Sequence, residues 1–404
     1  MKNILYIFLI CCFSFTIYSC AKKSGGSSGS SSSDANGNGG GTSCSFKNTK
    51  AFIVGNAVTE KCIFYDCPES KIVIWDLNGC MKVVGESVLG AVDAASHNNS
   101  IYIADDAGYY WIVGEGNKIE KKQINYPSGH KPSEITGISV NSTGNVYVAG
   151  KVRKNNKIYS AYWKNGELVK TFREDKTWDS EKNVAADSKG NVFIPGKRYV
   201  SHTTEYAALW INGTRKNLST VHDGEATDAV IGSETASGSN VWISGGQGLS
   251  QQGYSRAAYW RRKPNGTTSQ TSVTKVGTYN LGVSEFNSSI ARSIFVKGST
   301  VYMAGVVNVI NAGDVPVYWK TQTQYELQVE FNFETCDRCK AEPNDISLLD
   351  GNVLVVGDYY DANDKVDSYY THGEKKAVYW LDKKLHILCE SCGSSYAVAV
   401  VVMD

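Results

Sequence analysis

The 404-residue chain shows no excess of charge of either sign, and it contains little proline and little histidine. It has 41 lysine and arginine residues against 40 aspartate and glutamate residues, whereas nucleic-acid-binding proteins usually carry a basic excess. We therefore expect no nucleic-acid partner. The six histidines form no HExxH-type cluster, and no P-loop, dinucleotide fingerprint or nucleophile elbow occurs in a fitting context. These absences predict no metal, no cofactor and no catalytic residues, and so they argue against an enzyme.

The abundant residues indicate a folded β-protein. Hydrophobic residues make up 42% of the chain and aromatic residues 11%, which is too apolar for a disordered or polyanionic chain. There are 39 glycines, 24 tyrosines and nine tryptophans, but only seven prolines. Aromatic side chains suit pleated strands and glycine suits tight turns. The composition therefore favours an all-β fold.

The first 19 residues are predicted to be a signal peptide. A basic start is followed by an apolar run from Ile4 to Tyr18, which is shorter than the roughly 20 residues that a spanning helix needs. The end of this run and the two residues after it, Ile17-Tyr18-Ser19-Cys20, resemble a bacterial lipobox, in which Tyr18 is bulkier than the usual residue. The resemblance implies that the Cys20 thiol takes a diacylglyceryl group and becomes the mature N-terminus. The alternative is an ordinary signal peptide followed by a chance cysteine.

Residues 20–43 are predicted to be the lipidated cysteine and a flexible tether. Their glycine- and serine-rich sequence cannot bury apolar surface, and such a coil reaches roughly 25–30 Å on average. A folded domain of residues 44–404 follows. We expect the chain to be attached to a membrane through Cys20 in the envelope of a diderm bacterium, at the outer membrane and on its periplasmic or surface face.

One sequence pattern returns seven times from residue 51 onward. Its clearest copy has a short strand at Ile138–Val140, a turn, the run Val146–Gly150, a polar segment and the sequence AYWKNG at Ala161–Gly166. Seven of the nine tryptophans occupy the same place in the repeat, 36 to 61 residues apart. These seven residues are Trp75, Trp111, Trp163, Trp210, Trp260, Trp319 and Trp380. We expect each to be a core residue that packs between sheets.

Each repeat divides into four strand-sized pieces, which describes one blade of a β-propeller. Asn-Gly turns join the third and fourth pieces, and small residues in the first piece suit a crowded centre. The domain begins with a second strand at Ala51–Gly55, and the chain ends with the apolar run Ser394–Asp404, which has the character of a first strand. The sequence therefore predicts a seven-bladed β-propeller of four-stranded antiparallel blades that is closed by pairing of the N- and C-terminal strands.

Two segments, Asn141–Gly150 and Asp187–Gly196, resemble the bacterial β-propeller repeat family with its D-x-x-G-N-V-Y-V-x-G consensus. The other five copies match more loosely. The resemblance implies a seven-bladed fold in a cell-envelope protein. It implies no activity, because propellers serve as binding modules and as enzymes.

Eight cysteines follow Cys20, and an even number in an exported chain predicts up to four disulfides. The two CxxC pairs among them also allow a four-cysteine zinc site or redox-active thiols, but export favours oxidation. The candidates are Cys44, Cys62, Cys67, Cys80, Cys336, Cys339, Cys389 and Cys392.

Two regions are candidate binding sites. The connections between second and third strands (residues 151–160, 197–206, 246–256 and 358–376) are rich in tyrosine and polar residues, and they are expected to be long loops that form either ordinary surface or a recognition surface. The last of these includes an acidic segment, residues 358–367, which is either solvated or holds calcium. Polar residues at the first strands are expected to ring the central channel: Asp93, Glu134, Asp228, Arg292 and Asp345.

We therefore expect a monomeric, membrane-anchored envelope lipoprotein whose propeller binds or scaffolds a protein or glycan partner. An alternative is an envelope enzyme that acts on polysaccharide, a lyase or a glycosidase, with its site in the central funnel. Two carboxylates about 5–10 Å apart in a pocket there would favour a glycosidase. A purely structural envelope protein is the third possibility.

Overall fold

The computed structural model describes the propeller and its connections, and the described residues belong to one compact unit, Ser43–Asp404. They are residues 46, 49–58, 70–87, 90–175, 183–201, 204–220, 224–248, 255–272, 286–309, 313–329, 340–360, 375–389, 392 and 394–403.

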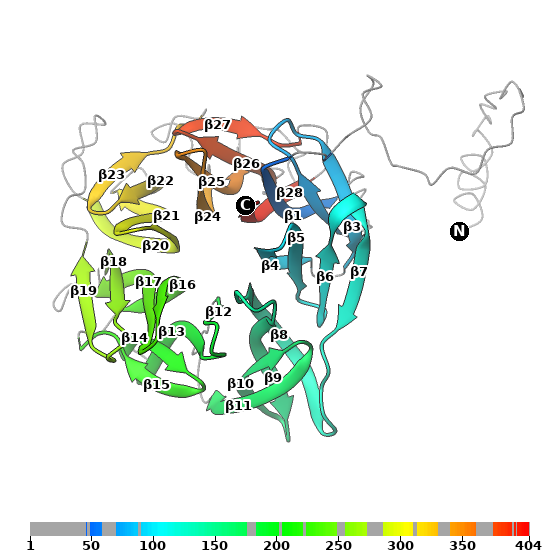
Figure 1. Cartoon of the computed structure of the whole chain (residues 1–404). Coiled ribbons are helices and arrows are strands. Elements are labelled where there is room, and N and C mark those ends of the chain that lie inside the picture. Colours follow the sequence, from blue (N-terminus) through cyan, green and yellow to red (C-terminus); the bar gives the residue numbers. More distant parts are fainter. Residues whose placement is uncertain are drawn as a thin grey trace, which may run out of the picture. The chain divides into compact units, whose positions relative to one another are not determined.

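These residues form seven four-stranded antiparallel sheets, which Figure 1 shows as the blades of a ring around a common centre. The strands of each blade are given from first to fourth. Blade 1 contains β28 (Ser394–Val402), β1 (Ala51–Val58), β2 (Lys71–Trp75) and β3 (Met81–Glu86), and blade 2 contains β4 (Ala91–His97), β5 (Ser100–Asp105), β6 (Tyr109–Val113) and β7 (Ile119–Gln123). Blade 3 contains β8 (His130–Val140), β9 (Val146–Lys154), β10 (Lys157–Lys164) and β11 (Glu167–Asp175). Blades 4 and 5 are β12 (Ala185–Ala186), β13 (Val192–Ser201), β14 (Thr204–Ile211), β15 (Thr214–Asn217); β16 (Glu225–Thr235), β17 (Gly238–Gly248), β18 (Ser255–Arg262), β19 (Thr268–Ser272). Blades 6 and 7 are β20 (Phe286–Lys297), β21 (Thr300–Val309), β22 (Gly313–Lys320), β23 (Thr323–Glu326); β24 (Lys340–Leu349), β25 (Asn352–Tyr360), β26 (Lys375–Leu381), β27 (Lys384–Ile387).

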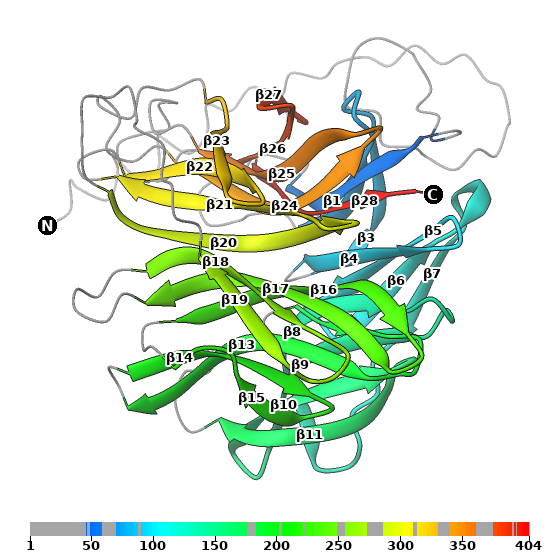
Figure 2. The same ribbon diagram turned by 60° about the vertical axis from the view of Figure 1, so that its left-hand side comes forward.

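The predicted closure is confirmed. Strand β28 pairs antiparallel with β1, so that Phe52 lies opposite Val401 and Val54 opposite Ala399. Strand β1 is buried along almost its whole length, and β28 is made of buried and partly buried residues, because the neighbouring blades cover both strands. The pairing joins segments from the two ends of the domain in one sheet and leaves no open edge inside the ring. Figure 2 shows β28 beside β1, with β24 as its neighbour in the next blade.

The repeated tryptophans are confirmed as core residues. Each lies on the third strand of its blade, and six of the seven are at most 1% exposed, while Trp111 is 8% exposed. Two of the indoles bond to the preceding blade: Trp163 Nε1 donates to the carbonyl of Asn125 at 3.0 Å, and Trp380 Nε1 donates to that of Gln328 at 2.7 Å. One side chain thus fills the space between two sheets and fixes their separation.

The glycine that ends the second-strand run is required by close approach. A Cβ on Gly245 would lie 1.9 Å from the carbonyl oxygen of Glu225 on the adjoining first strand, and one on Gly150 would lie 2.2 Å from that of Glu134. The first strands of both blades carry a register irregularity just after this contact. The irregularity brings the two backbones together at a point where only glycine fits.

The D-x-x-G-N signature and the Asn-Gly turn are parts of one hydrogen-bonded corner. Asp187 Oδ1 accepts from the backbone N–H of Asn191 at 2.7 Å, which closes the turn between the first and second strands. Asn212 has a positive φ of 50° in the turn between the third and fourth strands. Its Nδ2 donates to Asn191 Oδ1 at 3.1 Å, and its Oδ1 accepts from Val192 N–H at 2.8 Å. The two motifs recur together because they bond to each other.

The expectation of long loops between second and third strands is wrong where the structure describes them completely. Strand β9 continues to Lys154 and β10 begins at Lys157, so residues 151–160 form a tight hairpin. Its two turn residues, Asn155 and Asn156, have φ values of 50° and 59°, as a two-residue hairpin turn requires. In the part of the chain that the structure describes, no helix has the length and apolar character needed to cross a membrane.

Candidate functional site

The first strands of the blades line the centre of the ring, and most of them carry an irregularity at the same place. The register shifts between Ala91 and Asp93, between Ala226 and Asp228, between Ala291 and Ser293, and between Pro343 and Asp345. The bulged residue and the residue after it therefore face different levels of the central channel. The bulged residues are Val92, Thr227, Arg292 and Asn344; the residues that follow them are Asp93, Asp228, Ser293 and Asp345.

Three of the four residues after the bulges, all except Ser293, line a cavity of about 670 Å³, which we call the inner cavity. All seven first strands, with their adjoining turns, contribute to its wall, and Asp93, Asp228 and Asp345 are among its lining residues. No lysine or arginine is among the described residues that line it. The charged residues among the described lining of the inner cavity are therefore all acidic: the three aspartates and Glu234.

Each of these carboxylates bonds its own strand to the next blade. Asp93 accepts from the backbone N–H of Ala94 and from that of Ile138 in blade 3, both at 2.8 Å. Asp345 accepts from Ile346 N–H and from Val400 N–H on the closing strand β28, again at 2.8 Å. The carboxylates thus satisfy backbone donors that the irregular strands leave without a ladder partner.

Asp228 is the most heavily bonded of the three. Its Oδ1 accepts from Ala229 N–H and from Asn183 Nδ2 in blade 4, both at 2.7 Å. Its Oδ2 accepts from Ile294 N–H at 3.0 Å and contacts Ser293 Oγ at 3.0 Å, both in blade 6. The same Ser293 Oγ lies 2.6 Å from Asp345 Oδ1. One hydroxyl therefore lies between two carboxyl groups.

Burial raises the pKa of all three carboxyls. Burial and then the negative charge of Asp345 raise the pKa of Asp228 to about 7. Burial also raises the pKa of Asp345. The pKa of Asp93 is raised first by burial and then by the negative charges of Asp345 and Asp228. The backbone donors act in the opposite direction but are outweighed.

A second cavity, of about 630 Å³, lies at the starts of the first strands, and we call it the mouth cavity. Its aliphatic lining residues are Val92, Ile290 and Val398, and its polar ones are Glu225, Thr227, Arg292 and Asn344. Glu225 pairs in the sheet with Gly246 near the end of β17, so this level is on the face that carries the connections between second and third strands. The predicted loop face and the predicted channel residues therefore meet here.

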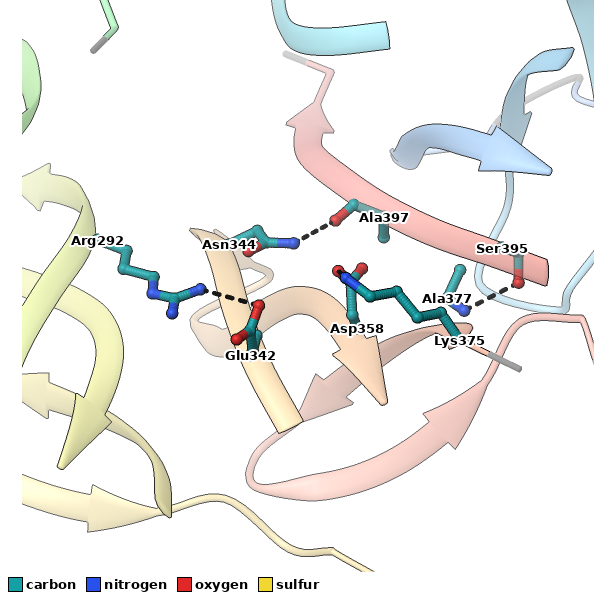
Figure 3. Close-up of polar contacts among 8 residues, drawn as sticks. All are labelled: Arg292, Glu342, Asn344, Asp358, Lys375, Ala377, Ser395 and Ala397. Carbon is teal, nitrogen blue, oxygen red and sulfur yellow. Dashed lines mark hydrogen bonds and ion pairs between the residues drawn. The ribbon is translucent and has the colours of Figure 1, made fainter. Parts of the chain in front are cut away.

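The charges around the mouth cavity are held in ion pairs between side chains. Arg292 lies 3.5 Å from Glu342 (Figure 3), and Lys197 lies 3.6 Å from Glu225 and 3.3 Å from Glu205. The side chains of Arg292 and Glu342 are about 30% exposed, at 30% and 29%. A partly exposed ion pair of this kind contributes little to stability, so replacing one partner by a ligand costs little.

Blade 7 and the closing strand β28 contribute Asn344 and Val398 to the wall of the mouth cavity. Figure 3 shows the polar contacts between them. Asn344 Nδ2 donates to the carbonyl of Ala397 at 2.8 Å. Asp358, which lies opposite Glu342 in the sheet, has one carboxylate oxygen 3.6 Å from Lys375 Nζ. Burial raises the pKa of Asp358 to about 6, although Lys375 acts to lower it. Its other oxygen, Oδ1, is buried without a hydrogen-bond partner.

The structure places the five predicted channel residues at different levels. Asp93, Asp228 and Asp345 line the inner cavity and Arg292 lines the mouth cavity. Glu134 lines neither of these cavities; it is 47% exposed in its side chain and pairs with Lys151 at 2.9 Å. The sequence reasoning overlooked three uncharged residues: Asn183 and Ser293, which contact Asp228, and Asn344, which lines the mouth cavity. Alignment of the repeats on the residue that starts each irregularity would have found Ser293 and Asn344.

Three of the eight candidate cysteines lie among the described residues. Cys389 and Cys392 form a disulfide with each other, with Cα atoms 5.5 Å apart, and Cys80 is also disulfide-bonded. Two of the four sulfurs that the zinc alternative needs are therefore in a bond to each other. The other candidates, Cys44, Cys62, Cys67, Cys336 and Cys339, lie outside the described residues, as does Cys20.

No group of three or more potential ligand side chains suited to a metal ion occurs among the described residues. The acidic segment that was a calcium candidate begins on β25 with Asp358, and its residues 361–367 lie outside the described part of the chain.

Seven four-stranded antiparallel blades around a channel define a seven-bladed β-propeller. No protein-family model and no curated protein matches the sequence. Among solved structures, the acylaminoacyl peptidase of Pyrococcus horikoshii is similar with a TM-score of 0.50 and 12% identity, covering 84% of this chain and 50% of that chain. This chain thus matches half the length of that peptidase.

Two further solved structures have lower scores. A catalytically inactive virginiamycin B lyase of Staphylococcus aureus, with quinupristin, has a TM-score of 0.40 and 11% identity, covering 77% of this chain and 93% of that chain. TolB of Acinetobacter baumannii has a TM-score of 0.40 and 12% identity, covering 68% of this chain and 61% of that chain. At these identities the likeness concerns the fold alone.

Proposed function

We propose that this chain is a lipid-anchored envelope protein whose propeller binds a glycan in the mouth cavity. The observation that carries the proposal is the two-sided chemistry of that cavity. Three aliphatic side chains come from blades 1, 2 and 6, whereas the polar side chains come from blades 5, 6 and 7. Sugars are two-sided in the same way, because each ring has hydroxyl groups at its edge and C–H groups on its faces.

The polar groups suit hydroxyl recognition. Glu225, Arg292 and Asn344 carry a carboxylate, a guanidinium and an amide, each of which is planar and can bond two neighbouring hydroxyls. The cavity volume of about 630 Å³ is within the range of small-ligand sites. A protein partner would instead need a broad apolar centre, and only two large hydrophobic residues, Val169 and Val200, are exposed among the described residues.

Binding is tested with the full-length protein on an array of envelope polysaccharide fragments. We expect Arg292→Ala and Asn344→Ala to weaken binding at least about tenfold, as expected when buried hydrogen-bonding groups are left unpaired. Arg215→Ala is the matched control, because Arg215 is exposed on the outer strand β15. Equal binding by all variants, or no binding to any fragment, would count against the proposal.

The membrane anchor rests on the resemblance of residues 17–20 to a lipobox. Cells grown with a labelled fatty acid should incorporate the label into the wild-type protein and not into Cys20→Ser. Labelling of both proteins would place the lipid elsewhere, and labelling of neither would leave an ordinary signal peptide. Protease treatment of intact cells then distinguishes the surface from the periplasmic face.

A polysaccharide-acting enzyme is the second candidate, favoured by the closeness of Asp228 and Asp345 in the inner cavity. Binding has better support, because the oxygens of both carboxyl groups are engaged by backbone N–H, hydroxyl or amide groups. A general acid or base must be free to reach its substrate. Release of reducing ends or unsaturated products from a bound polysaccharide would favour the enzyme.

A further inference from the structure

The two contacts of Ser293 cannot both be hydrogen bonds if both neighbouring carboxyl groups are ionised. Its Oγ lies 2.6 Å from Asp345 Oδ1 and 3.0 Å from Asp228 Oδ2, and both distances are within hydrogen-bonding range. A serine hydroxyl has one proton to donate, and an ionised carboxylate can only accept. Both contacts are hydrogen bonds only if one of the two carboxyl groups carries a proton.

The two distances favour Asp228 as the group that carries the proton. A hydroxyl that donates to an ionised carboxylate makes a short bond of about 2.5–2.7 Å. The contact with Asp345 has this length, so Ser293 donates to Asp345. With the proton on Asp228, its carboxyl O–H donates to Ser293 Oγ across the longer contact of 3.0 Å, and both contacts are hydrogen bonds.

We propose that Asp228, Ser293 and Asp345 form a proton-binding bridge that holds one proton near neutral pH, joins blades 5, 6 and 7, and makes the propeller and its mouth cavity sensitive to pH. The bridge is adjacent to the mouth cavity along the chain. Thr227, Arg292 and Asn344, which line the mouth cavity, are the residues immediately before the three members of the bridge. A change in the spacing of the bridge therefore moves the polar wall of the mouth.

The groups that face the bridge supply no compensating positive charge. Asp93 from β4 and Glu234 from β16 line the same inner cavity, and the described lining residues from β8, β12, β20 and β28 are uncharged. At the mouth level, Arg292 is paired with Glu342, and Lys197 is paired with Glu225 and Glu205. When the bridge loses its proton, the two carboxylates repel each other, and no lysine or arginine among the described residues lines the inner cavity beside them.

The expected direction follows from proton linkage. The pKa of Asp228 is raised to about 7, whereas an unfolded aspartate has a pKa of about 3.9. The folded protein therefore holds the proton over a pH range in which the unfolded chain has lost it. Folding is favoured at acid pH, and this contribution is lost as the pH rises through about 7.

The test is denaturant unfolding of the full-length protein at a series of pH values. In the wild type, the bridge is expected to raise the unfolding equilibrium constant by about tenfold to a hundredfold between about pH 5 and pH 8. In Asp228→Asn this part of the pH dependence should disappear, whatever the stability of the variant. Asp350→Asn makes the same chemical change at an exposed ion pair with Lys50, and it should keep the wild-type pH dependence.

Infrared spectroscopy keeps the proposal testable if Asp228→Asn does not fold. The folded wild type near pH 7, where Asp358 with its pKa of about 6 is mostly ionised, should show the C=O band of a protonated carboxyl group, and the band should fade as the pH rises further. An unchanged pH dependence in folded Asp228→Asn, or no such band in the wild type, would overturn the proposal. Stabilisation by added calcium or sodium at pH 8, in place of protons, would also overturn it.

The effect on the mouth rests on the proposed glycan binding and is measured separately. Affinity for a fragment found on the array should change between acid and alkaline pH in the wild type and stay constant in Asp228→Asn. If no fragment binds at any pH, the glycan proposal fails while the unfolding and infrared results still decide the proton bridge. If binding is found but has the same pH dependence in both proteins, coupling to the mouth is wrong.

Discussion

The mouth cavity and the inner cavity are built from adjacent residues of the same strands, yet they satisfy their charges differently. At the mouth, side chains of opposite charge meet, as Arg292 meets Glu342. In the inner cavity, Asp93, Asp228 and Asp345 bond to backbone N–H groups of the next blade, and no lysine or arginine is present among the described lining residues. Side-chain partners can be exchanged for a ligand, whereas backbone partners cannot leave without opening the ring. The comparison therefore separates a level suited to binding from a level that holds the blades together.

The comparison predicts its largest effect at Asp345. Asp345→Ala removes the acceptor of Ile346 N–H, Val400 N–H and the Ser293 hydroxyl, and one of these donors lies on the closing strand. We expect a loss of about 2–4 kcal/mol in the free energy of unfolding, measured by denaturant titration near pH 6. A loss as small as that of an exposed aspartate would mean that the inner carboxylates do not hold the blades.

The next effect concerns Asp358, the buried carboxyl at the mouth level. Its pKa is raised to about 6, so the folded state holds a proton that the unfolded chain loses at lower pH. Stability from this group is present in acid and is lost as the pH rises through about 6. Asp358→Asn should reduce the change of the unfolding constant between about pH 4 and pH 7 by roughly tenfold. An unchanged pH profile would show that Lys375 keeps the carboxylate ionised in the fold.

A smaller effect on stability is expected at Arg292. Arg292→Ala breaks a partly exposed ion pair with Glu342, and such pairs contribute less than about 1 kcal/mol. The same variant is the one expected to lose glycan binding. A thermal unfolding comparison with the wild type therefore sharpens the distinction between the two levels. If Arg292→Ala destabilises the protein as much as Asp345→Ala, the mouth is a structural element and the distinction fails.

The smallest effect is expected at Lys50. Its ion pair with Asp350 is 2.9 Å long, but the two side chains are 66% and 64% exposed. Lys50→Ala should change the free energy of unfolding by no more than about 0.5 kcal/mol, and added salt should remove the difference. A salt titration of the wild type and the variant provides the measurement. A larger effect would show that exposed ion pairs in this ring matter more than their solvation suggests.

The sequence predicts that the residues of the candidate site reach the central channel, but it does not predict which of the two cavities each residue lines. The small-residue first strands place Asp93, Asp228 and Asp345 at the channel, and the sequence shows this. Arg292 lies one repeat position earlier, and the bulge sends its side chain to the other cavity. A bulge is set by contacts with the neighbouring strand, so it leaves no clear mark in a single sequence. Ser293 carries no charge, and its place between two carboxyl groups from other blades has no mark in its own repeat.

The hairpin at residues 151–160 has a different lesson. Its polar composition predicted a loop, but Asn155 and Asn156 are suited to a two-residue turn with positive φ. The strands on either side continue to the turn because their backbones pair with each other while their polar side chains stay in contact with water. Turn residues were the better guide here, and composition was the poorer one.

The sequence by itself determined the number of blades, their four-strand order, the seven core tryptophans and the union of Ala51–Gly55 with the C-terminal run. These features depend on local patterns, which are alternation, turn residues and one indole in each repeat. The tertiary structure alone decided that one serine lies between two carboxyl groups from different blades, and that charges one residue apart face separate cavities. Those facts depend on how seven sheets meet at a point, and no stretch of a single repeat contains that information.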